Sequence, residues 1–290
     1  MTSKETGSVK SASAKIGIGF IYMFLTSVVL LTIYPIVYIV LGSFKENREL
    51  LLGGLNLVPE KFILSNYTNA WSLGNFGQYT MNSIFISLSV MLIILFISSM
   101  AGYCFDRKDF FMKEFIYGLM IAFMFINVGS ISLRPLFELA VKLKLNNSLW
   151  GVILISAGGA QAANIFLVRS FMKTIPKELD EAARIDGCTF FQIYWKIILP
   201  LLKPILATIA LLSFRSAWNE YILPLVFTMS NAALRPLTVG VVSLRMSGDG
   251  AAAWNIMFAG SAISIIPIVI IYALTSKHFM SGLTVGAVKG

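Results

Sequence analysis

The segment Pro176-Lys177-Glu178-Leu179-Asp180-Glu181-Ala182-Ala183-Arg184-Ile185-Asp186-Gly187, continued by Cys188 to Pro200, is a polar island in a chain that is 57% hydrophobic. It predicts two short helices. Pro176 suits a first helical turn, where its missing N–H is not needed, and Gly187 suits the left-handed position just after a helix end. Thr189 and Gln192 have the spacing of a capping box, which predicts the start of the second helix.

The first of these helices carries charges between small and apolar residues. Lys177 and Glu181 stand four residues apart, as do Asp180 and Arg184, and opposite charges at this spacing pair on one helix face. We therefore expect two ion pairs within the helix. The small and apolar residues between them leave a surface on which another protein could dock.

Asp186 lies at the C-terminal end of that helix, where the helix dipole disfavours a carboxylate by a few tenths to about 1 kcal/mol. Two interpretations stay open. A cation or an N–H group outside the helix offsets the charge, or Asp186 caps the turn that follows.

Composition places the chain among polytopic membrane proteins. It has 290 residues, of which 13% are charged, and a mean hydropathy of +0.79, far above soluble folds. The net charge is +9, but the cations lie in short connectors and form no basic stripe with aromatic residues, so we expect no nucleic-acid partner. A single histidine, His278, and two cysteines give no metal-ligand pattern.

Six hydrophobic runs are long enough to cross a bilayer as helices, which takes about 20 apolar residues each. We predict them at 16–41, 82–104, 115–131, 149–171, 201–226 and 254–274. The connectors that this places inside hold more Lys and Arg than those outside, so both termini are expected to be cytoplasmic. The predicted fold class is an all-α membrane protein with six transmembrane helices.

This topology divides the chain into four predicted parts: a disordered cytoplasmic tail (1–15), the first transmembrane helix with an external loop (16–79), a core transmembrane domain (80–277) that contains the polar loop 175–204, and a cytoplasmic C-terminal tail (278–290). Within the core domain, residues 134–145 predict a short interfacial helix. The pair Gly158-Gly159 is expected to allow close helix packing rather than to act as a hinge.

Polar side chains within the predicted spans are costly in lipid and usually face a cavity or a partner helix. Gln161 and Asn164 share one face of the fourth span, and Arg215 and Asn219 share one face of the fifth, where Glu220 follows. Two interpretations stay open for these residues. They line a translocation path for a polar solute, or they contact a second membrane subunit.

The polar island resembles the EAA loop in membrane subunits of bacterial ATP-binding-cassette (ABC) importers. The resemblance rests on Glu181-Ala182-Ala183, on Gly187, and on Ile197 with Leu199-Pro200 at the family's spacing. The ending Ser281 to Gly290 is similar to the tail of the maltose-type carbohydrate permease subunits. The run Trp218 to Tyr221 also looks like the fifth span of that family, and the resemblance covers the chain from about Lys15 to its end.

The resemblance implies a type I importer domain in the bacterial cytoplasmic membrane, working by alternating access. It implies that Glu181, Ala182, Ala183, Asp186 and Gly187 couple the chain to an ATPase subunit. The expected partners are a second, similar permease subunit, two ATPase subunits, an extracytoplasmic solute-binding protein, a carbohydrate and the lipid bilayer. ATP and Mg²⁺ would be bound by the ATPase, since this chain has no Gly-x-x-x-x-Gly-Lys-Ser/Thr loop.

Two other functions stay open. An ABC importer for a non-sugar solute would share the architecture. A secondary transporter would be expected to show inverted repeats and broken midplane helices, which are not evident in the sequence. An enzyme is not expected, because no nucleophile, base and orienting group occur at a recognisable motif spacing.

Overall fold

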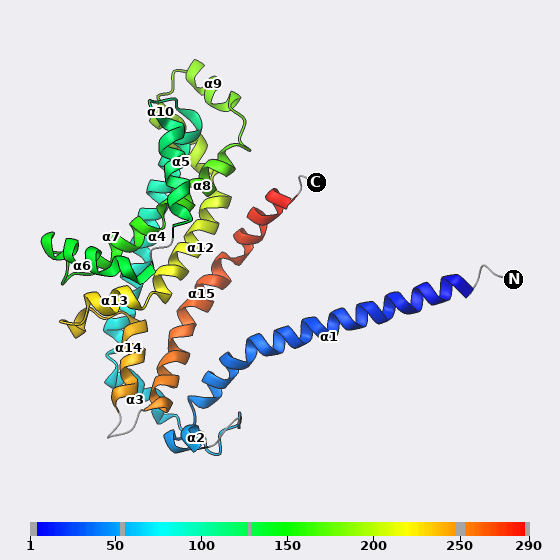
Figure 1. Ribbon diagram of the computed structural model, residues 1–290, viewed down its shortest axis with the longest axis vertical. Coiled ribbons are helices and arrows are strands. Elements are labelled where there is room, and N and C mark those ends of the chain that lie inside the picture. The colour runs from blue at the N-terminus through cyan, green and yellow to red at the C-terminus, as the bar shows by residue number, and fades with distance from the viewer. Residues whose placement is uncertain (1–4, 53–55, 127–128, 248–252, 288–290) are drawn as a thin grey trace. The chain divides into compact units, whose positions relative to one another are not determined.

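The computed structural model describes residues 5–52, 56–126, 129–247 and 253–287, with side chains described at 17–52, 56–126, 129–245 and 253–273. Throughout this part of the chain every regular element is a helix (Figure 1). The chain divides into two compact units, one of Met1–Leu73 with Leu244–Ile263 and one of Gly74–Ser243 with Ser264–Gly290.

The first unit contains α1 (Glu5–Gly42), α2 (Asn47–Leu52), α3 (Ser65–Leu73), η4 (Leu244–Ser247) and the first residues of α15 (Trp254–Ala287). Its polar connector folds around Asn66, which is 3% exposed. The Asn66 amide donates to the carbonyl oxygens of Ser43 and Lys45, both at 2.9 Å, and accepts from Asn255 at 2.8 Å. A buried amide with all these partners satisfied holds the connector in one conformation.

The second unit is built around α4 (Phe76–Arg107). Ile86, Val90 and Ile94 lie one helical turn apart and are all buried. The helices that pack on α4 are α7 (Leu149–Gly159), α8 (Gln161–Met172), α12 (Lys203–Asn219) and α14 (Leu237–Ser243). The remaining elements are α5 (Lys113–Met124), η1 (Gly129–Ser132), α6 (Leu133–Lys142), α9 (Glu178–Ile185), α10 (Phe190–Ile193), the π-helical turn η2 (Tyr194–Ile198), α11 (Leu199–Leu201), α13 (Ile222–Phe227) and η3 (Ala232–Leu234). Figure 1 shows α9 and α10 at one end of this unit and α14 toward the other.

Three helices are long and apolar enough to cross a membrane by themselves: Gly17–Gly42, Phe76–Arg107 and Trp254–Ala273. Three helix pairs meet the same criterion together and are bent at a short break: Lys113–Met124 with Gly129–Lys142 by 116°, Leu149–Gly159 with Gln161–Met172 by 47°, and Phe190–Leu201 with Lys203–Asn219 by 76°. With each bent pair counted as one crossing, the described residues give six. The all-α fold class with six spans is confirmed in this form.

The fourth span differs from its prediction. It was expected to be one helix with Gly158 and Gly159 in close packing, but α7 and α8 meet at 47°, and a Cβ atom on either glycine would meet nothing within 4 Å. The close-packing interpretation was therefore wrong. Two adjacent glycines weaken a helix through their conformational freedom, and the Asn164 side chain supports the break by donating to the Ala160 carbonyl oxygen at 2.8 Å.

In the third and fifth spans, too, a helix ends earlier than predicted. Helix α5 ends at Met124, and α6 is the short amphipathic helix expected at 134–145. Helix α12 ends at Asn219, because Glu220 takes an extended conformation. The Glu220 carboxylate then accepts from the Leu223 N–H at 3.3 Å, at the start of α13.

At both ends of the chain the helices run further than predicted. Helix α1 already begins at Glu5, within the segment 1–15 that was expected to be a disordered tail. Helix α15 runs to Ala287, into the expected C-terminal tail 278–290. The last three residues lie outside the described part, as do all side chains of the segment Ser281 to Gly290 that resembles the maltose-type tail.

The contact between α4 and α8 can be tested at Gly102. A Cβ atom there would lie 2.5 Å from Val168 Cγ1 and 3.2 Å from the Arg169 backbone nitrogen, so we expect Gly102→Ala to destabilise the fold by about 1–3 kcal/mol. Thermal unfolding in detergent would show this as a lower melting temperature. Gly118→Ala is the matched control, since its Cβ would meet nothing within 4 Å, and its melting temperature should stay the same or rise. Equal melting temperatures for both variants would contradict the packing described here.

Candidate functional site

The polar island forms a loop of short helices at one end of the second unit. Helix α9 begins at Glu178, so Pro176 precedes the helix and does not occupy its first turn as predicted. The first helical hydrogen bonds run to the Lys177 carbonyl oxygen, from the Asp180 and Glu181 N–H groups at 3.0 and 3.2 Å. Ile175 therefore stays outside the helix, and its carbonyl oxygen accepts a hydrogen bond from Arg107 Nη2 at 2.7 Å.

The end of α9 is closed by a Schellman motif. The Cys188 N–H donates to the Ala183 carbonyl oxygen at 2.9 Å, and the Gly187 N–H to that of Arg184 at 3.0 Å. This arrangement requires a left-handed residue at Gly187, whose φ is +81° as the sequence predicted. The turn directs the chain from α9 into α10.

Helix α10 begins with the predicted capping box. The Thr189 N–H donates to Gln192 Oε1 at 2.7 Å, and the Gln192 N–H donates to Thr189 Oγ1 at 3.4 Å. The helix then widens into the π-helical turn Tyr194–Ile198. Pro200, just beyond it, has no N–H to donate to the preceding turn, which favours this irregularity.

The charges of α9 pair differently from the prediction. Asp180 does not pair with Arg184: it is 2% exposed and pairs with Arg107 of α4, Nε to Oδ2, at 2.9 Å. Lys177 and Glu181 are both exposed, and no ion pair joins them in the described structure. Asp180 pairs with the buried Arg107 rather than with Arg184, four residues along its own helix, because the attraction between opposite charges is stronger where water is excluded.

The opposite face of α9 points to solvent. Glu181, Ala182, Asp186 and Gly187 are exposed, and Ile185 is 87% exposed, so this face offers apolar surface beside carboxylates. Ala183 is the exception among the expected coupling residues, since it is 4% exposed and packs inward.

Neither interpretation of Asp186 is realised inside the chain. Its backbone N–H donates to the Ala182 carbonyl oxygen at 3.0 Å. Its carboxylate is exposed and has no hydrogen-bond partner among the described residues. The unfavourable position at the helix end is therefore left for water or another molecule to offset.

The polar residues expected within spans four and five do not form one cluster. The Gln161 side-chain nitrogen and oxygen are both buried, with no hydrogen-bond partner in the described structure. Asn164 is occupied at the α7–α8 break. Arg215 and Asn219 are exposed, and Arg215 borders a separate apolar groove with Tyr272 of α15.

Glu220 alone among these residues lines the cavity of about 410 Å³ within the second unit. Its wall includes the backbone at Gly159 and Ala160, where α7 ends. Five serines also line it: Ser130, Ser132, Ser156, Ser213 and Ser216. The volume is in the range of small-ligand sites, and hydroxyls with a carboxylate can exchange hydrogen bonds with a polyhydroxylated solute. Sequence reasoning missed the serines, although Ser213 and Ser216 share one face of the fifth span by their spacing.

Comparison with known proteins places these features in a family. Residues 94–281 match the family described as "Binding-protein-dependent transport system inner membrane component". The arabinooligosaccharides transport system permease protein AraQ of Halalkalibacterium halodurans is 34% identical over 99% of this chain and 99% of that protein. The probable starch degradation products transport system permease protein AmyC of Thermoanaerobacterium thermosulfurigenes is 34% identical over 90% of this chain and 93% of that protein.

A solved structure has the same fold. It is a chain of a bacterial ABC transporter involved in the import of the acidic polysaccharide alginate, and it superposes with a TM-score of 0.80 at 26% identity. The match covers 92% of this chain and 98% of that chain.

The Schellman motif can be tested at Gly187. Gly187→Ala should raise the free energy of the left-handed turn by about 1–2 kcal/mol, with no steric clash, because a Cβ there would meet nothing within 4 Å. Hydrogen exchange at the Gly187 and Cys188 amides, followed by mass spectrometry, should become roughly 5–30 times faster. Gly187→Asn is the control and should change exchange less, since asparagine tolerates this conformation. Equal exchange in all three proteins would rule out this role for the turn.

Proposed function

Because this chain belongs to the family of binding-protein-dependent transport system inner membrane components, we propose that it forms half of the translocation path of an ATP-driven importer for a carbohydrate. The chain is a transport subunit and not an enzyme. The observation that carries the proposal is the exposed face of α9, which offers apolar surface beside carboxylates at one end of the helical second unit.

A carbohydrate is the solute class that the relatives support. Two of them are named for arabinooligosaccharides and for starch degradation products, and the similar solved structure is of an alginate importer. The serine-lined cavity of this chain suits such a solute, because sugar hydroxyls both donate and accept hydrogen bonds. A non-sugar solute remains an outcome that the uptake experiment below can give.

Family membership implies that the chain works with another permease, an ATPase and a binding protein. We propose the finer arrangement of a heterodimer with a second, similar permease, two ATPase copies that bind ATP and Mg²⁺, and an extracytoplasmic binding protein, in the bacterial cytoplasmic membrane. In this arrangement Glu181, Ala182, Asp186 and Gly187 contact the ATPase, and the buried Ala183 spaces α9 from the core.

We assign some of the intramembrane polar residues to the translocation path and others to the contact with a second subunit. We assign Glu220 to the path, since it lines the cavity. We also assign Gln161, which does not line the cavity, because it directly follows Ala160 of the cavity wall and its buried amide has no partner in the described part of this chain. An unsatisfied buried amide costs about 1–3 kcal/mol unless something else binds it. We propose that Arg215 and Asn219, which are both exposed, contact the second permease.

The partner proposal is tested by purifying the tagged chain from its native membrane in mild detergent and identifying the co-purifying proteins by mass. We expect a second permease, an ATPase and a solute-binding protein. Proteoliposomes of that complex should take up arabinooligosaccharides or starch degradation products only when ATP is present. A chain recovered alone that carries solute without ATP would identify a secondary transporter, and uptake of only non-sugar solutes would reject the carbohydrate.

The path proposal is tested with Gln161→Ala and Glu220→Gln. Removal of the Gln161 amide breaks no hydrogen bond seen within this chain, so its melting temperature should not fall, whereas uptake per complex should fall about 2- to 10-fold through loss of a solute contact. Asn219→Ala should instead lower the yield of heterodimer. Unchanged uptake for both path variants would contradict the proposal.

A further inference from the structure

A buried ion pair joins α9 to the last turn of α4. Arg107 Nε lies 2.9 Å from Asp180 Oδ2, and the two side chains are 3% and 2% exposed. Tyr103, one turn earlier on α4, donates its hydroxyl to Asp180 Oδ1 at 3.2 Å. Both carboxylate oxygens of Asp180 therefore bind side chains of α4.

The guanidinium of Arg107 also holds the chain on either side of this pair. Nη2 donates to the Ile175 carbonyl oxygen at 2.7 Å, in the segment that leads into α9. Nη1 donates to Asp106 at 2.6 Å, and that side chain is 8% exposed. Because a guanidinium is planar and its donors point in fixed directions, three acceptors fix its orientation. Arg107 therefore connects both α9 and the segment that leads into it to the end of α4.

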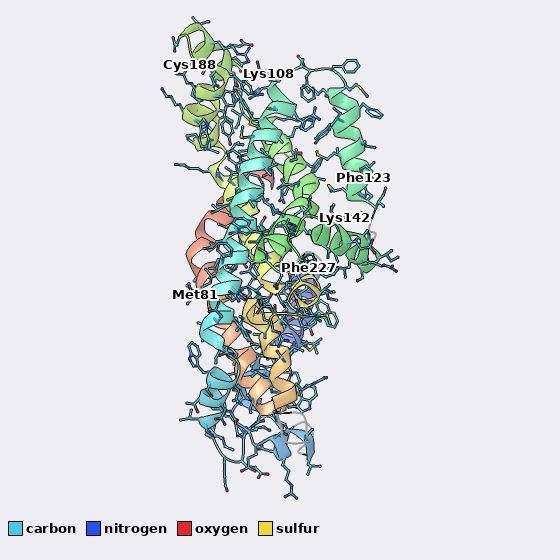
Figure 2. All side chains as sticks on the ribbon, turned by 90° about the vertical axis from the view of Figure 1, so that its left-hand side faces the viewer. Met81, Lys108, Phe123, Lys142, Cys188 and Phe227 are labelled. Atoms are coloured by element: carbon cyan, nitrogen blue, oxygen red, sulfur yellow. The ribbon has the colours of Figure 1, made fainter. Side chains whose placement is uncertain are left out.

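The second half of the loop is attached to the same helix. The Tyr103 ring stacks on Phe190 with the ring centroids 4.6 Å apart, and the Ser99 and Tyr194 hydroxyls are hydrogen-bonded at 2.7 Å. Figure 2 shows Lys108 and Cys188 at this shared end of the second unit. Both halves of the loop are therefore attached to the end of α4.

Helix α4 carries this connection to the cavity, because Val90 and Ile94 line the cavity wall. The helix is continuous from Phe76 to Arg107. Ile94 lies about 20 Å along the helix from Arg107, at a rise of 1.5 Å per residue. A tilt imposed at Arg107 thus reaches the cavity wall through one element.

We propose that the Arg107–Asp180 pair is the joint through which ATP-driven movement of α9 is passed to α4 and the cavity. This inference rests on the proposed function. Arg107 and Asp180 are positioning residues, since neither lines the cavity. Stability gives a weak reason for such a pair, because apolar residues often replace a buried ion pair without loss of stability. Passing a movement of α9 to α4 in one fixed direction, in contrast, requires the oriented hydrogen bonds of the Arg107–Asp180 pair.

The test follows the cavity while the ATPase is switched. In the intact complex, with Cys104 and Cys188 replaced by serine, Ser216→Cys places one thiol at the cavity, where Ser216 is exposed. Its rate of reaction with a small thiosulfonate reagent is measured without nucleotide and after trapping with ATP, Mg²⁺ and vanadate. We expect the two rates to differ by roughly tenfold, in the range of ordinary coupling between sites.

Asp180→Asn, added to this reporter, should bring the two rates within about twofold of each other, while ATPase subunits still co-purify. Asp109→Asn is the matched control, because this carboxylate follows the same end of α4 but its side chain is fully exposed. It should keep the tenfold difference. A tenfold difference retained in Asp180→Asn would overturn the inference, since a merely structural role would alter yield and not this ratio.

Arg107→Lys keeps the inference testable if Asp180→Asn does not assemble. Lysine retains the positive charge beside Asp106 and Asp180 but lacks the planar fork that reaches three acceptors. We expect a reduced ratio in an assembled complex, and an unchanged ratio would overturn the inference. Failure of the proposed function gives a different result: no ATPase co-purifies, or the reporter without further changes shows no response to ATP.

Discussion

The constraint behind this structure is that a backbone in lipid must satisfy its own polar groups, because no water is present to do so. Continuous helices meet this requirement, as α1 and α4 do. Each break in a helix must meet it by other means. At the α7–α8 break the Asn164 amide binds the Ala160 carbonyl oxygen, and beyond α12 the Glu220 carboxylate binds the Leu223 N–H. Both breaks border the same cavity, so these two interruptions of the helical backbone coincide with the space open to a solute.

The sequence predicted the features that depend on neighbouring residues. Gly187 had the left-handed conformation because a Schellman motif needs it, and Thr189 with Gln192 formed the capping box. The six hydrophobic runs also corresponded to the six crossings, since hydropathy summed over about 20 residues is insensitive to detail. That insensitivity is also why the breaks in spans three, four and five were not predicted.

What could not be predicted depends on residues far apart in the chain. Asp180 was assigned to Arg184 by spacing, yet it pairs with Arg107, 73 residues away. The serines of the cavity come from three different elements, η1, α7 and α12, and each looks ordinary in its own segment. Of the five polar residues expected along a path, only Glu220 reaches the cavity. Burial and tertiary contact decide such assignments, and a local pattern carries neither.

Helix α1 has a consequence for how this sequence can change over time. Every residue from Gly17 to Val37 is exposed, so no other element of the first unit fixes the shape of a side chain there. The bilayer requires only length and hydrophobicity. Mutations that exchange one apolar residue for another should therefore accumulate freely along this helix, whereas α4, buried over much of its length, must keep the shape of each inward-facing side chain. Helices α1 and α4 of the same chain are thus expected to tolerate different substitutions: any apolar residue in α1, but only residues of matching shape on the buried face of α4.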